Sequence, residues 1–448
     1  MMPRVRFITL GCRVNQYETQ AMREQLEREG MMSLSRVQAK GHGPEHEVEW
    51  VIINTCTVTG EADRENLYWI RRARREHPKA RIAVTGCFAE KDRPKILALG
   101  GIDLVLGNRE KPKLAEHLRA LALGEDESGR GCKDGAREFP DLRVSGSFER
   151  SRAYIKIQDG CDHRCSYCKV VLVRGRSRSR PIDEIVEETE RLAASGLREI
   201  VLTGVQLGAY GRDFARPSSL PEVIRACARI PGIARIRLSS IEPTDITTPL
   251  IETLSTLEQC CSHLHIPLQS GDNGVLRRMN RRYRRDFFKQ KVIELQQAMP
   301  DFLFSTDVIA GFPGETEREF ESTVALLEEL RPLKCHVFPY SRREGTRAAS
   351  FLPLPAKVVR ERVKRLLAMS LDLSRQAQGR FSGRIFPVLI EGKQDREGHC
   401  QGLTSNHMKV FIRTETLEPG TLVRVRLVEP EEEAWRAELV GLTLGRRP

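Results

Sequence analysis

Three closely spaced cysteines mark the first candidate site. Cys161, Cys165 and Cys168 are spaced C-x3-C-x2-C within "DGCDHRCSYCK". A structural zinc site needs four ligands and a disulfide needs two cysteines, so three thiols suit neither. An iron–sulfur cubane commonly takes four thiolates, and with three of them one iron keeps an open position where a substrate can bind. The alternative interpretations are half of a zinc ribbon or three incidental buried thiols.

A second set of three cysteines is dispersed along the first part of the chain. Cys12, Cys56 and Cys87 directly follow the apolar runs "RFITLG", "VIINT" and "RIAVTG". The carboxyl ends of parallel strands meet at one edge of a doubly wound sheet, so we expect these thiols to converge there. Three convergent thiols would hold a second cluster, again with one iron open. A single free cysteine is normally a small buried hydrophobe, and we interpret the other cysteines as structural: Cys132, Cys227, Cys260, Cys261, Cys335 and Cys400.

The composition is that of a globular protein with several domains. The 448 residues are too many for one core, and charged residues make up 30% and hydrophobic residues 40%. No apolar run reaches the ~18 residues of a membrane span, and the apolar stretch of the first 16 residues is too short for a secretory signal. We therefore expect a cytoplasmic protein without a membrane partner. In that compartment cysteines more often bind metals or catalyse than form disulfides.

The positive charge predicts a polyanionic partner. The formal net charge is +12, and arginines cluster in residues 71–75, 174–180 and 277–285. Dense arginine clusters favour nucleic acid as the partner, while solvated helix faces are the alternative.

The elements around the cysteines predict an α/β protein of three parts. Residues 1–122 alternate short apolar runs with helical patterns, which predicts a doubly wound parallel sheet. Residues 123–147 are polar and Gly-rich and read as a linker. Residues 148–375 repeat strand and helix six times, too few for a closed eight-fold barrel, so we expect an open (β/α)6 barrel with its active site at the carboxyl ends of the strands. Residues 376–448 alternate in the strand manner, which predicts a small all-β barrel or sandwich.

With both cysteine sets in view, the chain resembles the methylthiotransferase family of radical S-adenosylmethionine enzymes from end to end. The C-x3-C-x2-C motif, with Tyr167 before its last cysteine, is typical of the radical superfamily. The stretches "LGCRVNQYET", "INTCTVT", "KIQDGC" and "HIPLQSG" resemble the branch that acts on N6-threonylcarbamoyladenosine in transfer RNA. The resemblance implies an N-terminal domain with an auxiliary cluster, a central radical S-adenosylmethionine barrel and a C-terminal TRAM domain.

The resemblance also implies the cofactors and the chemistry. Two [4Fe–4S] clusters would be held by the two cysteine sets. One S-adenosylmethionine would donate a methyl group to a sulfur on the auxiliary cluster, and a second would be cleaved to a radical at the other cluster. The radical would remove hydrogen from carbon 2 of the adenine, where the methylthio group is transferred. The residues that would contact S-adenosylmethionine are Tyr167, Gly204, Val205, Gln206, Ile309, Gly311 and Glu315.

The implied partners are the anticodon stem-loop of transfer RNA, modified at position 37, and an electron donor such as flavodoxin or ferredoxin. The arginines beside the radical motif are candidate phosphate contacts: Arg174, Arg176, Arg178 and Arg180. Three alternatives stay open, which are isopentenyladenosine as the substrate, a ribosomal-protein aspartate as the substrate, and a non-catalytic zinc-dependent RNA-binding protein.

The sequence departs from the family pattern beside the radical motif. After the third cysteine the family usually has two apolar residues and a proline before Arg-Gly. Here the stretch is "CKVVLVRG", with Lys169 in an apolar place and Val171 in the place of proline. We therefore expect the shape of this loop to differ. His263 and His265 alternate on one predicted strand and are assigned no role.

Overall fold

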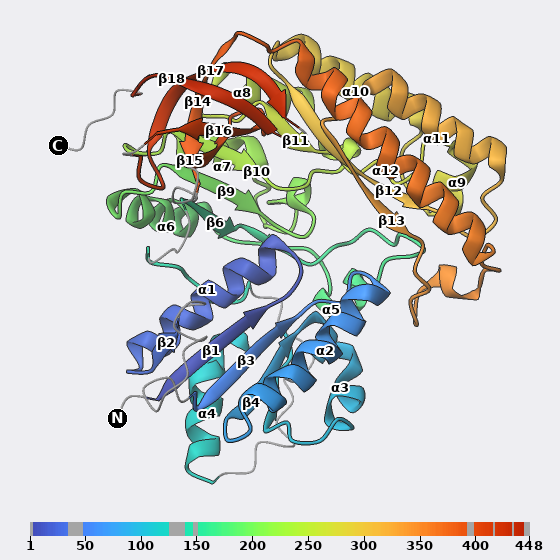
Figure 1. The fold of residues 1–448 in the computed structure, drawn as a ribbon. Coiled ribbons are helices and arrows are strands. Elements are labelled where there is room, and N and C mark those ends of the chain that lie inside the picture. The colour runs from blue at the N-terminus through green and yellow to red at the C-terminus, as the bar shows by residue number, and fades with distance from the viewer. Residues whose placement is uncertain are drawn as a thin grey trace. The chain divides into compact units, whose positions relative to one another are not determined.

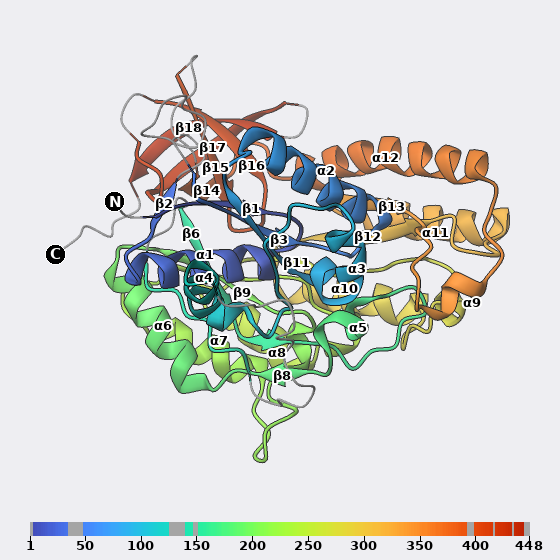
Figure 2. The same cartoon turned by 90° about the horizontal axis from the view of Figure 1, so that it is seen from below.

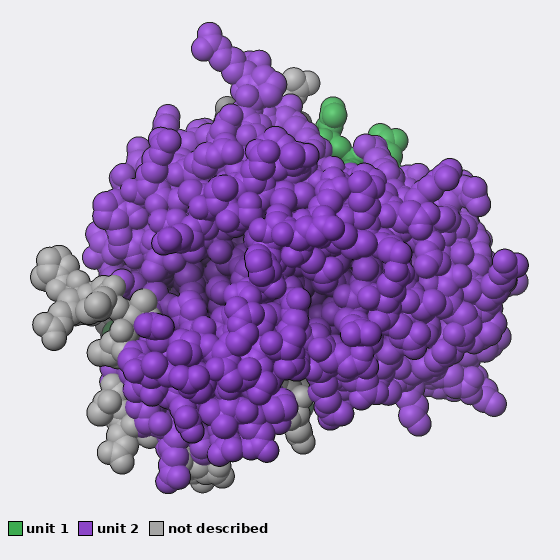
Figure 3. Space-filling model, turned by 90° about the horizontal axis from the view of Figure 1, so that it is seen from above, with its two compact units in different colours: residues 1–147, 158–180, 341–346 green, residues 148–157, 181–340, 347–448 purple. Residues whose placement is uncertain are grey.

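The structure is a computed structural model, and it describes residues 3–34, 48–124, 139–146, 151–391, 398–414, 417–431 and 434–442. The chain forms two compact units, which Figure 3 draws in different colours. Unit 1 comprises residues 1–147, 158–180 and 341–346, and unit 2 comprises residues 148–157, 181–340 and 347–448. Each unit therefore draws on segments that are far apart in the sequence.

Unit 1 is built on a parallel sheet of five strands in the order β2-β1-β3-β4-β5. The strands are β1 (Arg4–Thr9), β2 (Met32–Leu34), β3 (Trp50–Thr55), β4 (Arg81–Gly86) and β5 (Leu104–Val105). The helices are α1 (Arg13–Arg28), α2 (Gly60–Glu76), α3 (Cys87–Leu97) and α4 (Leu114–Ala122). Figure 2 shows α1 and α2 on opposite sides of the sheet. The predicted doubly wound sheet is thus confirmed.

Burial explains why the strands of unit 1 read as continuous apolar runs. Every residue of β3 is buried, as expected for a parallel strand that is covered by helices on both faces. Val51 and Ile53 pack with Ile70 of α2 and Phe88 of α3 in one core. Helix α2 begins where the Thr59 side chain accepts a hydrogen bond from the Ala62 N–H.

Later segments of the chain complete unit 1. The short strands β7 (Gln158–Asp159) and β8 (Arg178–Ser179) pair antiparallel, and α5 (Val170–Arg174) lies between them in the chain. The segment 341–346 is tied to the loop before α2, because Ser341 Oγ accepts a hydrogen bond from the Gly60 N–H at 2.9 Å. Tyr17 of α1 donates to the carbonyl of Leu142. Most of the expected linker, 125–138, lies outside the described residues, and so does Cys132.

Unit 2 contains the predicted open barrel. Its six parallel strands form two three-stranded sheets, β6-β9-β10 and β11-β12-β13, joined by a bridge between Ser240 and His265. The strands are β6 (Arg152–Lys156), β9 (Glu199–Thr203), β10 (Arg235–Leu238), β11 (His263–His265), β12 (Leu303–Ala310) and β13 (Lys334–Pro339). The helices are α6 (Ile182–Ala194), α7 (Leu220–Ala228), α8 (Thr248–Thr256), α9 (Asn273–Arg278), α10 (Arg285–Ala298), α11 (Glu317–Leu330) and α12 (Ala356–Gly379). In Figure 1, α10, α11 and α12 lie side by side along β12 and β13.

The last part of unit 2 is a small closed β-barrel with the strand order β14-β15-β16-β18-β17. The strands are β14 (Ile385–Ile390), β15 (His399–Thr404), β16 (Lys409–Arg413), β17 (Leu422–Glu431) and β18 (Ala434–Leu442). Alternate residues of these strands, among them Val388, Val410, Val423 and Trp435, form its core. This closed barrel is consistent with the expected TRAM domain.

A buried charge network joins the closed barrel to the strands of the open one. Arg235 and Arg237 of β10 pair with Glu199 of β9. Their remaining donors reach main-chain carbonyls of the closed barrel: Arg235 donates to Leu403 and Arg237 to Thr404. Burial opposes the charge of Glu199, but Arg237, Arg235 and Arg152 outweigh it and lower the pKa of this carboxyl to about 2.

The structure thus confirms the predicted α/β class, the doubly wound sheet, the six-unit open barrel and the terminal all-β part. Four strands were not predicted: the short β2, β7 and β8, and the six-residue β15. In the part of the chain that the structure describes, no helix has the length and apolarity needed to cross a membrane.

Candidate metal centres

The three dispersed cysteines lie where the order of the strands in unit 1 reverses. Cys12 follows β1 and Cys56 follows β3, and the chain turns outward in opposite directions from these two neighbouring strands. Cys87 follows β4 as the first residue of α3. The carboxyl edge at such a switch point is where open parallel sheets bind ligands.

Two glycines let the thiols approach one another. Gly11 precedes Cys12 with φ +83°, and a Cβ at this position would lie 2.4 Å from the Cβ of Cys56. Gly86 precedes Cys87 with φ +101°, and a Cβ there would lie 2.4 Å from the carbonyl oxygen of Thr55. A side chain at either position would push two strand ends apart, so these glycines hold the cysteines together.

The electrostatics confirm that the three sulfurs are neighbours. Burial, and after it the charges of Cys12 and Cys87, raise the pKa of the Cys56 thiol to about 12, while Arg174 acts in the opposite direction. Cys56 and Cys87 are buried and Cys12 keeps exposed surface. A thiol with this environment becomes a thiolate readily only when a metal binds it.

The radical motif forms an irregular loop between β7 and α5. Cys161, Cys165 and Cys168 are all half-buried. The Cys161 N–H donates to the carbonyl of Gly175 at 3.0 Å, and the Cys168 N–H donates to the carbonyl of Cys165 at 3.1 Å. Gly160 before the loop has φ +74°, and a Cβ there would lie 1.9 Å from the carbonyl oxygen of Arg176. The return segment 175–176 is therefore packed tightly against the start of the loop.

The unusual Lys169 has a specific partner. Its Nζ lies 2.8 Å from Oδ2 of Asp92 on α3, and both side chains are buried. Burial raises the pKa of Asp92, but hydrogen bonds from Lys169 and Lys95 outweigh this and hold it below its ordinary value. Val171 is the second residue of α5, a first-turn position that tolerates proline or valine alike. The helix thus forms without the proline.

The four arginines proposed as phosphate contacts have unequal exposure. The side chain of Arg176 is 91% exposed, whereas that of Arg174 is 3% exposed. Arg178 is paired with Asp159, and Arg180 donates to the hydroxyl of Tyr17. Only Arg176 has the free surface that a phosphate contact needs, because the other three are buried in unit 1.

Sequence reasoning missed the residues around Arg174. Its guanidinium donates to Asn15, Glu18 and Asp159, and its Nε donates to Cys87 Sγ. Lys111, which is fully buried, also pairs with Glu18. The only sequence signal was indirect: Asn15 and Glu18 lie three and six residues after Cys12, on the helix that this cysteine precedes.

The proposed S-adenosylmethionine contacts other than Tyr167 lie in unit 2, at the carboxyl ends of two strands. Gly204, Val205 and Gln206 follow β9, and Ile309 lies near the end of β12. The Gly311 N–H donates to the carboxylate of Glu315 at 3.0 Å, and Arg362 pairs with the same carboxylate at 2.6 Å. Glu315 therefore fixes the Gly-Phe-Pro-Gly turn after β12.

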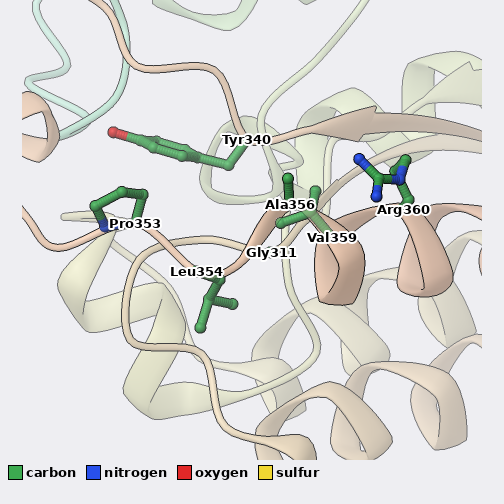
Figure 4. A pocket seen from close by; sticks show the side chains of 7 residues that line it. All are labelled: Gly311, Tyr340, Pro353, Leu354, Ala356, Val359 and Arg360. Carbon is green, nitrogen blue, oxygen red and sulfur yellow. The ribbon is translucent and has the colours of Figure 1, made fainter.

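A small pocket lies beside this turn (Figure 4). Its volume is about 260 Å³, and Gly311, Tyr340, Val359 and Arg360 are among the residues that line it. Ligand sites usually have a volume of ~300–1,000 Å³. The pocket is thus large enough for part of a cofactor and too small for a drug-sized molecule.

Three thiols beside a buried cation form a donor set that an iron–sulfur cluster could accept. Within the described ranges, no three His, Cys, Asp or Glu side chains stand close enough together to bind one metal ion. Four ligands around one zinc ion would each lie ~2.3 Å from it, whereas a cubane spreads its thiolates over different irons. The neighbouring Cys12, Cys56 and Cys87, with the cation of Arg174 beside them, match the wider and anionic group.

Comparisons with known proteins agree with this fold. Residues 155–327 match the Radical SAM superfamily, and residues 4–107 match Uncharacterized protein family UPF0004. The radical S-adenosylmethionine methyltransferase TsrM from Kitasatospora setae has a similar fold, with a TM-score of 0.56 at 18% identity over 78% of this chain and 77% of that one.

Full-length relatives are more similar in sequence. Threonylcarbamoyladenosine tRNA methylthiotransferase MtaB of Bacillus subtilis is 36% identical over 96% of this chain and 94% of its own length. The protein of the same name from Thermotoga maritima is 38% identical over 98% of both chains. The tRNA-2-methylthio-N(6)-dimethylallyladenosine synthase of Trichlorobacter lovleyi is 33% identical over 96% of this chain and 98% of its own.

The barrel and the superfamily match define a radical S-adenosylmethionine enzyme, which implies a [4Fe–4S] cluster and S-adenosylmethionine as cofactors. Within that class, the chain belongs to the methylthiotransferase family.

Proposed function

We propose that this protein adds a methylthio group to carbon 2 of N6-threonylcarbamoyladenosine at position 37 of transfer RNA. The observation that carries the proposal is the identity of 36–38% over nearly the full length to three relatives named for this substrate. A transfer-RNA substrate in turn supports a cytoplasmic location, and the reductive cleavage of S-adenosylmethionine would need an electron donor such as flavodoxin or ferredoxin.

A dimethylallyl (isopentenyl) adenosine is the second candidate substrate. Relatives named as dimethylallyladenosine synthases are 31–34% identical. These identities are below the 36–38% of the three threonylcarbamoyladenosine relatives. A fourth relative named for threonylcarbamoyladenosine is 33% identical and so falls within the lower range. The difference is small, so the two N6 substituents need a direct comparison.

In this proposal the two cysteine sets hold two clusters. Cys161, Cys165 and Cys168 would hold the cluster of the superfamily, and Cys12, Cys56 and Cys87 the auxiliary one. When bound, these groups supply the reductive cleavage of S-adenosylmethionine and the sulfur that is transferred. The domain boundaries stay those predicted: 1–122, 123–147, 148–375 and 376–448.

The chain's own residues hold and shield these groups. The glycines before Cys12 and Cys87 allow the thiols to converge, and the carbonyl of Gly175 fixes the start of the radical loop. Tyr167, Gly204, Val205, Gln206 and Ile309 would contact S-adenosylmethionine, and Gly311 and Glu315 would shape the turn beside it. Arg176 is the exposed arginine that would contact a phosphate of the anticodon stem-loop.

The test is an anaerobic assay with reconstituted protein, a reductant and S-adenosylmethionine. Two anticodon stem-loops are compared, one with N6-threonylcarbamoyladenosine and one with isopentenyladenosine at position 37, and the nucleosides are analysed by mass spectrometry. The proposal predicts methylthiolation of the first RNA and little of the second. Preference for the second RNA would show that isopentenyladenosine is the substrate. Cleavage of S-adenosylmethionine with neither RNA modified would contradict both candidate substrates.

A further inference from the structure

A buried arginine makes a direct contact with one of the proposed ligand sulfurs. The Nε of Arg174 lies 3.2 Å from Sγ of Cys87, and the arginine side chain is 3% exposed. Asn108 Nδ2 lies 3.8 Å from the same sulfur and also donates to the carbonyl of Val173. Sulfur accepts hydrogen bonds weakly when it is a neutral thiol and more strongly when it is a thiolate.

The other donors of Arg174 are fully used by neighbouring residues. Both terminal nitrogens pair with the carboxylate of Glu18, one of them also donates to Asn15 at 2.8 Å, and the other lies 3.3 Å from Asp159. Glu18 is held in turn by Lys111. Since these contacts fix the plane of the guanidinium, the Nε–H can point only at Cys87.

A role as a simple structural partner of Glu18 does not account for this geometry. The ion pair with Glu18 uses only the two terminal nitrogens and leaves the buried Nε–H to another acceptor, which is Cys87 Sγ. Arg174 is a buried cation in contact with Cys87, which directly follows β4 at the ligand-binding edge of the sheet. A cation at this place is suited to an anionic group at that edge.

The same residue is also linked to the other cysteine set. Gly175 directly follows Arg174, and its carbonyl accepts the hydrogen bond of the Cys161 N–H at 3.0 Å. One dipeptide therefore contacts Cys87 through a side chain and Cys161 through the main chain. A shift of this dipeptide would move ligands of both sets together.

We propose that Arg174 is a positioning residue that sets the reduction potential of the auxiliary cluster by donating a hydrogen bond to the Cys87 thiolate. The proposal rests on the proposed function, since it assumes a cluster on Cys12, Cys56 and Cys87. Hydrogen bonds to ligand sulfurs stabilise the more negative, reduced state and so raise the potential of a cluster. Without this donor the auxiliary cluster becomes harder to reduce.

The experiment isolates the auxiliary cluster in a Cys161→Ala, Cys165→Ala, Cys168→Ala background. Its potential is measured by redox titration followed by electron paramagnetic resonance. Arg174→Lys, which keeps the charge but not the Nε donor, is expected to lower the potential, and Arg174→Gln to lower it further. The matched control is Arg176→Lys, an exposed arginine on the same segment, which should leave the potential unchanged.

The outcomes separate this proposal from the proposed function. If the background variant binds no iron, the auxiliary cluster itself is refuted. If it binds about four irons but Arg174→Lys and Arg174→Gln leave the potential unchanged, Arg174 is only a partner of Glu18.

A second measurement avoids reliance on variants that fold poorly. In protein with an intact Arg174 and ¹⁵N-labelled arginine, the reduced auxiliary cluster should show a weak nitrogen hyperfine coupling. Its absence would also overturn the proposal.

Discussion

The Nζ of Lys169 and the carboxylate of Asp92 form a buried ion pair at 2.8 Å, which joins the residue after Cys168 to the helix that begins at Cys87. The pair accounts for a lysine where the family has an apolar residue. It ties the two cysteine sets together at a second point, apart from Arg174.

We expect Lys169→Met to destabilise the protein because it leaves the Asp92 carboxylate buried with only Lys95 as a partner. The expected loss is ~1–3 kcal/mol of unfolding free energy. A double-mutant cycle with Asp92→Asn measures the coupling by chemical denaturation of the metal-free protein. Lys95→Met is the control, since this side chain contacts the same carboxylate but is 58% exposed, and it should change stability little. A zero coupling energy would show that the pair contributes nothing.

The iron content tests the two cysteine sets directly. Anaerobically reconstituted protein should hold about eight irons per chain, and the Cys12→Ala, Cys56→Ala, Cys87→Ala variant about four. Iron and acid-labile sulfide are the measurements. About four irons in both proteins would contradict the assignment of an auxiliary cluster to Cys12, Cys56 and Cys87. Zinc in place of iron would favour the zinc-dependent RNA-binding alternative.

The approach of the strand ends depends on Gly11. In Gly11→Ala the new Cβ would lie 2.4 Å from the Cβ of Cys56, in a residue with φ +83°. We expect this variant to lose auxiliary iron as well as stability. Gly30→Ala is the matched control, because Gly30 has φ +78° but no atom within 4 Å of a new Cβ. It should cost only the ~1–2 kcal/mol of the left-handed backbone and keep its iron. Equal iron in both variants would contradict the steric argument.

Removal of the Glu199 carboxylate should leave two guanidinium groups buried without a counter-charge. Glu199→Gln is expected to cost ~3–5 kcal/mol at pH 7. The pKa of Glu199 is lowered in the folded protein, so its contribution is full above about pH 4.5 and is lost as the pH falls toward 2.

Chemical denaturation at pH 7 and pH 3 checks this prediction, and the gap between wild type and variant should be smaller at pH 3. Glu187→Gln is a surface control on α6, where the carboxylate is 58% exposed. A gap that does not depend on pH would refute the electrostatic origin of the effect.

Arg176 should contribute to RNA binding through charge alone. We expect Arg176→Ala to weaken binding of an anticodon stem-loop and to reduce the slope of log K against log salt by about 1. Titrations at several salt concentrations measure both. Arg375→Ala is the control, because Arg375 is 61% exposed and pairs with Asp372, just as Arg176 pairs with Asp162. If the two variants behave alike, Arg176 is ordinary surface charge.

The strands and helices that follow from local apolar patterns were predicted correctly from the sequence. The apolar runs before Cys12, Cys56 and Cys87 became the buried strands β1, β3 and β4, and the six strand–helix units became the open barrel. Three of the missed strands are short, since β2 has three residues and β7 and β8 have two each. The fourth, β15, includes Gln401 and Gly402, which weaken a strand pattern.

Contacts between distant residues could not be predicted. Arg174 reads as a surface arginine within an arginine-rich stretch, yet its partner Glu18 is 156 residues away. Lys169 and Asp92 are 77 residues apart. A single sequence does not indicate which charge is buried, because burial depends on the tertiary contacts of other segments.

Unit 1 is assembled from segments that are far apart in the sequence, and this has a consequence for protein synthesis. Arg343 pairs with Asp63 and donates to the Thr57 carbonyl, directly after Cys56 in the chain, although residue 343 is translated long after both. The N-terminal sheet therefore leaves the ribosome without its last segment, and the neighbourhood of Cys56 is finished only when most of the barrel has been made.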